Sequence, residues 1–351
     1  MPVPPRIVRR VLSPLFLAVE VGLAVGFTVA AAVAALVAPL TPRRRVLRIA
    51  AFGAAYMSVE IAVSVAALCL WLAAPRHWVR PPRPGSPDAG LWERRHFGLL
   101  AWALGAVLGA AGRLAGFRVV TEAAAGSTLG GDNPVLVLAR HGGPGDSFAL
   151  AHLLLAHGRR VRIVLKGVLQ LDPALDVVLN RLPSCFLPRR SSSGEDVAER
   201  VAALAATLRG ADALLLFPEG GNWTPRRRLD AIAHLRAERH ETAARAAEAM
   251  EHVLPPRPAG FLACMHCRPD LDVAVVAHTG LDRLVTARAI WDALPLDMPM
   301  TVRWWWTPAT LVPDTDEERY HFLTSQWAGV DGWIDARWAD SAGAGNPDLA
   351  I

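Results

Sequence analysis

The stretch that decides the fold is VLVLARHGGPGD, which runs from Val135 to Asp146. Its first five residues are apolar and have the length of a buried strand, and the glycines and proline after His141 predict a turn. Asp146 then stands at the start of an apolar helical stretch, Ser147–Ala156. A strand end, a turn and a helix start in this order can bring the imidazole of His141 beside the carboxylate of Asp146.

A histidine and a carboxylate held together form a general base. The carboxylate would fix the tautomer of the imidazole and stabilise the imidazolium that forms when His141 takes a proton. A structural interpretation remains open on these residues alone, with Asp146 as a helix N-cap and His141 as a loop histidine.

Beyond about residue 117, strand-length apolar runs alternate with helical stretches. The predicted strands are Val135–Ala139, Val161–Leu165, Cys185–Leu187, Ala213–Phe217 and Val273–Ala277, and the predicted helices are Ser147–Ala156, Leu169–Leu182, Glu195–Leu208 and Ala231–Met250. This alternation predicts an α/β sheet with helices on its faces, in which ligands gather at the carboxyl ends of the strands. Those ends carry Lys166, Arg189, Glu219 and His278, so we expect one polar site there.

Two further elements are predicted near the C-terminus. Thr301–Trp306 has the pattern of a strand with three successive tryptophans, and Thr315–Trp338 that of an amphipathic helix. The tryptophans could belong to the core or to a lip that contacts the membrane.

The N-terminal third predicts a membrane helical hairpin. Leu15–Ala38 and Ile49–Ala74 are apolar runs with one charge each, Glu20 and Glu60, and both exceed the ~20 residues that cross a bilayer. A charge at that depth is costly unless it is paired, so we expect both glutamates to face protein. Arginines flank the runs on all sides. Two crossings and a hairpin that dips into one leaflet therefore both remain open, with a slight preference for two crossings.

A third apolar stretch, Phe97–Phe117, contains Trp102 and several glycines. We interpret it as an interfacial or docking helix behind a Pro/Arg-rich linker at Pro81–Pro87. The predicted organisation has four parts: membrane helices in residues 1–80, linker and interfacial helix in 81–117, a catalytic domain in 118–338, and a flexible tail in 339–351.

The amino-acid composition limits the classes of molecule that the chain is expected to bind. Hydrophobic residues make up 52% of the 351 residues, and the net charge is +5. No helix-turn-helix pattern, zinc finger or aromatic nucleic-acid platform accompanies the charge, so we expect an anionic lipid surface and no nucleic acid. The four cysteines lack the spacing of a disulfide scaffold and indicate a reducing compartment.

Two other patterns compete with the general-base interpretation. The HGGPG turn resembles the oxyanion loop of α/β-hydrolases, but these need a Gly-x-Ser-x-Gly elbow, and the nearest approach, Ala339–Gly343, lacks its first glycine. Cys264 and Cys267 form a lone Cys-x-x-Cys without a second ligand pair at zinc-finger spacing. We therefore expect buried thiols there and no metal site.

Four blocks, in order, resemble the lysophospholipid acyltransferases, the family that includes 1-acyl-glycerol-3-phosphate and glycerol-3-phosphate acyltransferases. The blocks are His141 with Asp146 (His-x4-Asp), Phe186–Arg189 (Phe, hydrophobic, any, Arg), Phe217–Gly220 (Phe-Pro-Glu-Gly) and, loosely, Val273–Gly280. The ordered set covers about residues 135–281 and is far more specific than a lone His-x4-Asp. Arg140 and Gly221 depart from the family's usual Asn and Thr, and the run around His141 is similar to that of actinobacterial members.

The resemblance implies an α/β acyltransferase domain, a mixed sheet flanked by helices, behind the membrane hairpin. It implies that His141 deprotonates the hydroxyl of a lysophospholipid or glycerol phosphate while Asp146 orients it. The acyl donor would be acyl-CoA or acyl-carrier protein, with no cofactor, and the domain would lie on the cytoplasmic face of the cell membrane. The implied substrate-binding residues are Arg140, Lys166, Arg189, Phe217, Pro218, Glu219 and Gly220. A lipid hydrolase and a non-enzymatic membrane scaffold are the alternatives.

Overall fold

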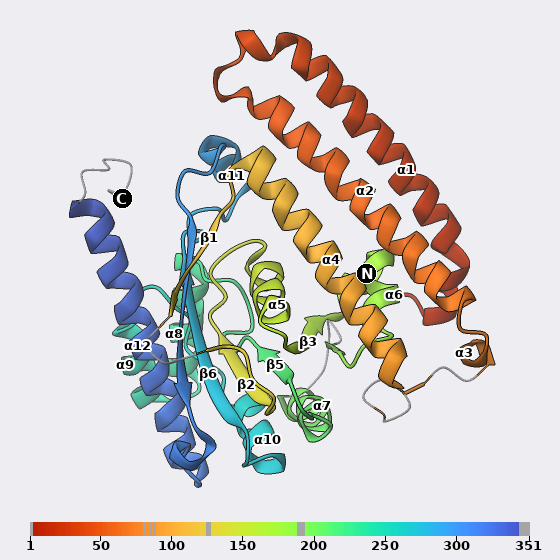
Figure 1. Ribbon diagram of the computed structural model, residues 1–351. Coiled ribbons are helices and arrows are strands. Elements are labelled where there is room, and N and C mark those ends of the chain that lie inside the picture. Colours follow the sequence, from red (N-terminus) through yellow and green to blue (C-terminus); the bar gives the residue numbers. More distant parts are fainter. Residues whose placement is uncertain are drawn as a thin grey trace. The chain divides into compact units, whose positions relative to one another are not determined.

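Figure 1 shows the computed structural model, which describes residues 3–79, 82–83, 86, 89–123, 128–187 and 194–343. The chain forms two compact units. The first holds residues up to 118 together with 148–193 and 290–299, and the second holds the segments between and after these. Both units therefore contain parts of the region predicted as catalytic, and the four-part division by chain order stays a prediction.

The second unit is built on a mixed sheet. Its strands are β1 (Val119–Ala123), β2 (Val135–Ala139), β5 (Asp212–Leu216), β6 (Asp272–Thr279) and β7 (Met300–Thr307), in the order β1-β7-β6-β2-β5. Neighbours are parallel except for β6 and β7. Strands β2 and β5 are buried along their whole length, as apolar strands inside an α/β sheet are. The predicted α/β class with a mixed sheet is confirmed.

The parallel strands β5, β2 and β6 place polar residues at one edge of this sheet. His141 follows β2, Phe217 follows β5, and His278 lies near the end of β6. Because parallel strands end at the same edge, residues far apart in the sequence come together there.

The helices of the second unit are α7 (Gly194–Ala206), α8 (Pro225–Ala237), α9 (Glu241–Glu248), α10 (Ala259–Cys267) and α12 (Asp316–Gly343), with a short η5 (Ala309–Leu311). The predicted helix Ala231–Met250 is two helices, because Arg239 adopts a left-handed φ of 61° between them. Residues 339–343 continue α12, so only 344–351 of the predicted tail lie outside the described residues.

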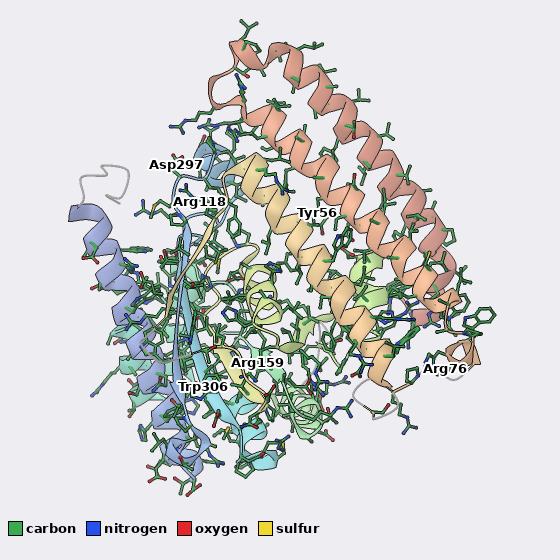
Figure 2. All side chains as sticks on the ribbon, in the orientation of Figure 1. Tyr56, Arg76, Arg118, Arg159, Asp297 and Trp306 are labelled. Carbon is green, nitrogen blue, oxygen red and sulfur yellow. The ribbon has the colours of Figure 1, made fainter. Side chains whose placement is uncertain are left out.

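The tryptophans of β7 pack inside the second unit. Trp304 is 3% exposed, and Trp305 packs edge-on against Trp333 of α12, with ring centres 6.3 Å apart. Trp306, labelled in Figure 2, is half-buried. Trp304 therefore belongs to the core, and the half-buried Trp305 packs against α12 of the same unit.

The first unit contains three long apolar helices: α1 (Arg6–Val37), α2 (Arg45–Leu72) and α4 (Gly90–Ala115). Helix α2 packs against both others, and Figure 1 shows the three side by side. Each is long and apolar enough to cross a membrane. The predicted hairpin is therefore confirmed in α1 and α2. The predicted interfacial helix begins at Gly90 instead of Phe97, which gives α4 the length of a third candidate span.

The other elements that lie wholly or mostly in this unit are short: η1 (Ala38–Leu40), η2 (Pro42–Arg44), α3 (Arg76–Val79), α5 (Asp146–Ala156), β3 (Arg160–Lys166), η4 (Gly167–Leu171), α6 (Pro173–Leu179), β4 (Cys185–Leu187) and α11 (Ala287–Ala293). Strands β3 and β4 pair in parallel. The predicted helix Leu169–Leu182 is a 3-10 turn followed by α6. Asp172 caps the new helix by accepting the backbone N–H of Leu175 at 2.9 Å.

The two glutamates of the membrane runs face protein, as predicted. Glu20 and Glu60 are each 8% exposed, whereas large apolar side chains of the same helices, such as Leu15 and Leu36, are exposed. The hairpin thus has an outer apolar surface suited to lipid.

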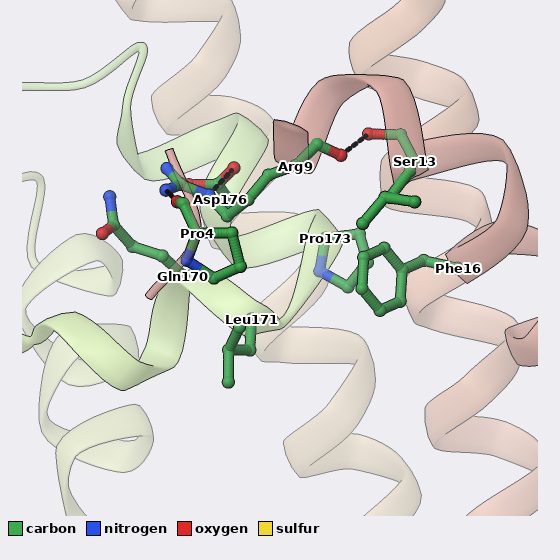
Figure 3. Close-up of a pocket in the computed structure, with 9 residues that line it drawn as sticks. Pro4, Arg9, Ser13, Phe16, Gln170, Leu171, Pro173 and Asp176 are labelled. Carbon is green, nitrogen blue, oxygen red and sulfur yellow. Dashed lines mark hydrogen bonds and ion pairs between the residues drawn. The ribbon is translucent and has the colours of Figure 1, made fainter. Parts of the chain in front are cut away.

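Each end of the hairpin contacts a segment from far along the chain. At one end, Nε and Nη2 of Arg9 donate to the two carboxylate oxygens of Asp176 on α6 at 3.1 and 2.8 Å (Figure 3). At the other end, Nη2 of Arg45 donates to the carbonyl of Asp292 at 2.8 Å. Two different distant segments therefore hold the hairpin, one at each of its ends.

Helix α4 is held in the same way. Near its start, Nη1 of Arg181 donates to Nε2 of His96 at 3.1 Å. At its end, the backbone N–H of Leu296 donates to the carbonyl of Ala115 at 2.7 Å. Just beyond, Arg118 donates to the carbonyl of Asp297 at 2.6 Å, and Figure 2 labels both residues.

Candidate active site

His141 and Asp146 form a hydrogen-bonded pair. Nδ1 of His141 lies 2.8 Å from Oδ2 of Asp146. A carboxylate only accepts, so Nδ1 carries the proton and Nε2 keeps its lone pair. The imidazole retains 17% exposure, whereas the carboxylate is 1% exposed. None of the described residues hydrogen-bonds Nε2, which is therefore the free base of the site.

The carboxylate of Asp146 is held from several directions. Oδ2 also accepts the backbone N–H of Gly143 at 3.2 Å, and Oδ1 accepts the backbone N–H and the hydroxyl of Ser147 at 2.5 and 3.0 Å. Burial opposes ionisation, but hydrogen bonds from His141 and His278 outweigh it and hold the pKa of Asp146 well below its usual range. Asp146 is therefore an anion that stabilises positive charge on His141.

His278 was expected at the polar edge of the sheet but was not among the predicted catalytic or substrate-binding residues. It is 0% exposed, and its Nε2 lies 3.1 Å from the carbonyl of Arg140 and 3.4 Å from Oδ2 of Asp146. Asp146 thus lies between two imidazoles. The available signal was the position of His278 at the end of β6, which is parallel to β2.

Arg140 is buried and its side chain is bonded within the protein, which argues against its predicted role as a substrate contact. It is 0% exposed and ion-paired with Asp282. Its guanidinium also donates to the carbonyl of His278 at 2.7 Å and twice to that of His252, at 3.1 and 2.6 Å. Burial opposes ionisation of Asp282, but the charges of Arg140 and His278 outweigh it and lower its pKa. Arg140 and its partners Asp282, His278 and His252 therefore anchor the turn that carries His141.

The glycines of the turn are required by close approaches. A Cβ at Gly142 would collide with the guanidinium of Arg140 and lie 3.0 Å from the His278 ring. A Cβ at Gly143 would lie 2.5 Å from the carbonyl oxygen of Leu281, which is backbone and cannot move aside. An arginine at position 140, where the family usually has Asn, therefore requires glycine at position 142.

Glu219 lies near the backbone of His141 and does not face solvent. It is 3% exposed, and Oε1 accepts the indole N–H of the fully buried Trp327 at 3.2 Å. Burial raises the pKa of Glu219 to about 8, partly offset by Arg140, Trp327 and the backbone amides of His141 and Leu254. Glu219 is therefore bonded to the backbone of the loop that carries His141, and its burial argues against its predicted contact with substrate.

The rest of the Phe-Pro-Glu-Gly block lies beside His141. The Phe217 and His141 rings have centres 4.7 Å apart, and the carbonyl of His141 accepts the backbone N–H of Trp223 at 2.7 Å. Pro218 is buried. Gly220 has φ of 69°, a left-handed conformation that favours glycine. The structure thus brings this block and the His141–Asp146 pair together.

Two predicted contacts belong to the first unit or lie outside the described residues. Lys166 is exposed at the end of β3 in the first unit. Arg189 lies outside the described residues, although Phe186 and Leu187 of its block form the end of β4. The roles of Lys166 and Arg189 stay predictions.

The structure also shows where the residues of the Cys-x-x-Cys and hydrolase-like patterns lie. Cys264 is buried as predicted, whereas Cys267 is exposed, and His266 between them pairs with Asp316 at 2.7 Å. The hydroxyl of Ser147 donates to Asp146 and not to His141. Within the described residues, His141 therefore has no serine or cysteine partner that a hydrolase of the serine type would need.

The comparisons with known proteins identify the class. Residues 119–261 match the model of the protein family described as Acyltransferase, a stretch that includes the His141–Asp146 pair and the Phe217–Gly220 block. Residues 119–261 therefore match an acyltransferase domain, in agreement with the prediction. Among solved structures, the 1-acyl-sn-glycerophosphate (LPA) acyltransferase PlsC from Thermotoga maritima is similar, with 12% identity, a TM-score of 0.46, and 80% of this chain and 97% of that chain covered. No curated protein matches the sequence significantly.

Proposed function

We propose that the chain transfers a fatty acyl group from an acyl thioester directly to the hydroxyl of a lysophospholipid or glycerol phosphate. Nε2 of His141 takes the hydroxyl proton while the oxygen attacks the thioester carbonyl carbon. The tetrahedral intermediate then collapses, the C–S bond breaks, and the departing thiolate takes the proton back from the imidazolium. Asp146 stays ionised throughout and stabilises the imidazolium. No acyl-enzyme forms.

The observation that carries this proposal is the geometry of the pair. The 2.8 Å bond to a buried anion fixes the Nδ1–H tautomer and leaves a partly exposed Nε2 without a protein partner. A nucleophile on the protein would occupy that atom, and a direct transfer needs it free for the acceptor. General-base help of this kind is worth ~10²–10⁴-fold in rate.

The ordered motifs described above and the basic composition support this choice of acceptor. Phe217, Pro218 and Gly220 form the loop beside His141, where an acceptor would lie. Arg189 and Lys166 are proposed contacts to its phosphate or to the donor. The donor is acyl-CoA or acyl-carrier protein.

The membrane is the proposed location, with the catalytic side facing the cytoplasm. Helix α4 is ~39 Å long at 1.5 Å per residue, longer than the ~30 Å hydrocarbon core. Its ends contact Arg181 and Leu296, and between those two residues no described helix is a candidate span. Both contacts therefore lie on one side, which favours helices lying within one leaflet over the two crossings preferred above. Labelling of single cysteines at positions 13 and 44 from the cytoplasmic side alone tests this placement, and two crossings would leave one of them unlabelled.

The activity test uses the purified full chain in lipid nanodiscs, labelled acyl-CoA, and a panel of lysophospholipids and glycerol phosphate, with products identified by mass spectrometry. We expect an acylated acceptor and stoichiometric free thiol. Release of free fatty acid independent of acceptor would identify a hydrolase. No turnover with any acyl-CoA or acyl-carrier protein, from protein that binds both substrates, would identify a scaffold.

A further inference from the structure

We propose that Arg227 and Arg257 form a phosphate-binding site beside the catalytic pair, for the phosphate of one of the two substrates. This inference rests on the proposed acyl transfer between a thioester carrier and a phosphate-bearing acceptor. It fills a gap, because Arg140 is buried and cannot reach a ligand.

Arg257 lies over Gly220. A Cβ built at Gly220 would lie 3.3 Å from both Cζ and Nη1 of Arg257. The backbone N–H of Arg257 donates to the carbonyl of Pro218 at 2.9 Å, which fixes the base of the side chain. The side chain is exposed, and no described residue hydrogen-bonds or ion-pairs its guanidinium. It is therefore a positioned cation with free donors.

Arg227 lies over the next residue of the same loop. A Cβ at Gly221 would lie 3.3 Å from Nη1 of Arg227, and that nitrogen donates to the carbonyl of Asn222 at 3.0 Å. The side chain is exposed, and Nε and Nη2 have no partner within the described residues. Because Gly220 and Gly221 are adjacent and carry no side chains, both guanidinium groups come close to one loop.

This loop is attached to the catalytic histidine. The residue after Asn222, Trp223, donates its backbone N–H to the carbonyl of His141, and Phe217 at the start of the loop contacts the His141 ring. Glu219, the acid of the loop, is turned into the core, and its raised pKa of about 8 leaves it mostly protonated at neutral pH. It does not cancel the positive charge.

Two planar guanidinium groups suit a phosphate, because each offers paired donors to its oxygens. The same chemistry has two sources here: the phosphate of the acceptor, and the phosphates of coenzyme A or of a carrier's phosphopantetheine. The experiment separates them.

Binding is measured on the full chain in nanodiscs with His141→Ala, which stops turnover, so that the result does not depend on transfer. The probes are 1-acyl-glycerol 3-phosphate and acyl-CoA, each with a phosphate-free counterpart, a monoacylglycerol and an acyl N-acetylcysteamine thioester. Arg227→Ala and Arg257→Ala are tested singly. Arg226→Ala is the matched control, because Arg226 has a 92% exposed side chain in the same helical turn and only a 3.9 Å contact to Asp230.

We expect each alanine variant to weaken binding of one phosphate-bearing probe by about tenfold or more, the effect of losing hydrogen bonds to a charged group. The affinity for the phosphate-free probes should change less than twofold in these variants. In Arg226→Ala, the affinity for all four probes should change less than twofold. A loss confined to the lysophosphatidate assigns the site to the acceptor, and a loss confined to acyl-CoA assigns it to the donor. Arg227 and Arg257 variants that behave like Arg226→Ala overturn the proposal, as does equal weakening of the phosphate-free probes. Absence of transfer in the unsubstituted protein would instead refute the proposed function alone.

Discussion

Replacing Asp146 with asparagine tests the proposed catalytic pair at the carboxylate that orients His141. Both carboxylate oxygens accept N–H groups: Oδ2 from His141 and Gly143, and Oδ1 from Ser147. An asparagine amide has only one acceptor oxygen, so its NH₂ group must face a donor in either orientation. If it faces His141, the imidazole must accept through Nδ1 and carry its proton on Nε2, which abolishes the base. If it faces Ser147, the tautomer survives but the anion that stabilises the imidazolium is lost.

Both orientations lower kcat, and the magnitude follows from the role lost. We expect kcat to fall ~10²–10⁴-fold, the worth of a general base with its orienting carboxylate, while the KM values of both substrates change little. One unsatisfied buried N–H should cost about 1–3 kcal/mol of stability. The assay is thiol release from acyl-CoA with a saturating lyso-acceptor, alongside thermal unfolding.

The matched control is Asp335→Asn, which changes another His–Asp contact. Asp335 lies 3.3 Å from His252 but has a 74% exposed side chain, so kcat should stay within twofold. A folded Asp146→Asn protein with kcat within tenfold of the unsubstituted enzyme would refute the reasoning.

Three further outcomes are expected. Glu219→Gln should remove a pH dependence of stability, because between about pH 4.5 and 8 the native state binds a proton at Glu219 that the unfolded state lacks. The stability of the unsubstituted protein therefore falls as pH rises through that window, by at most ~1.4 kcal/mol per pH unit. In thermal unfolding, the variant should gain stability relative to the unsubstituted protein from pH 5 to 8. Arg140→Ala should cost ~3–5 kcal/mol in urea unfolding, since Asp282 is left buried and unpaired, while substrate KM values in the folded protein stay unchanged; a phosphate-specific rise in KM would contradict the structural role. Arg9→Ala should lower the melting temperature more than Arg10→Ala, because only Arg9 pairs with the buried Asp176; equal effects would mean that the pair does not hold the hairpin.

The sequence predicted the elements that have strong local signals. β2, with its five apolar residues, β6, and the membrane hairpin are where hydrophobic length and periodicity placed them. The errors fall where single residues redirect the chain. Pro173 with its Asp172 cap starts a new helix, and Arg239 in a left-handed conformation splits another. Such breaks depend on one side-chain hydrogen bond or one dihedral, which periodicity does not detect.

The sequence predicted only the part of the site that depends on local spacing. The five-residue spacing of His141 and Asp146 across a glycine-rich turn constrains their distance locally, and the 2.8 Å bond follows from that. The role of Arg140 depended instead on Asp282, His252 and His278, which are close only in three dimensions. An arginine beside a catalytic histidine is ordinarily expected to bind substrate. Only the burial of its partners shows that this one holds the loop.

The buried groups around the pair explain why a rigid base can be built on a glycine-rich turn. Glycine makes a backbone flexible, yet this turn is fixed by contacts from β6 through His278, from Asp282 through Arg140, and from α12 through Trp327 and Glu219. These contacts end on the backbone of Arg140, on its guanidinium or on the Glu219 carboxyl, and none occupies Nε2 of His141. The side chains that fix the base are therefore separate from the atom that reacts. Substitutions in these supporting residues should change stability and kcat together, whereas substitutions in the exposed arginines of the Gly220–Gly221 loop should change substrate binding alone.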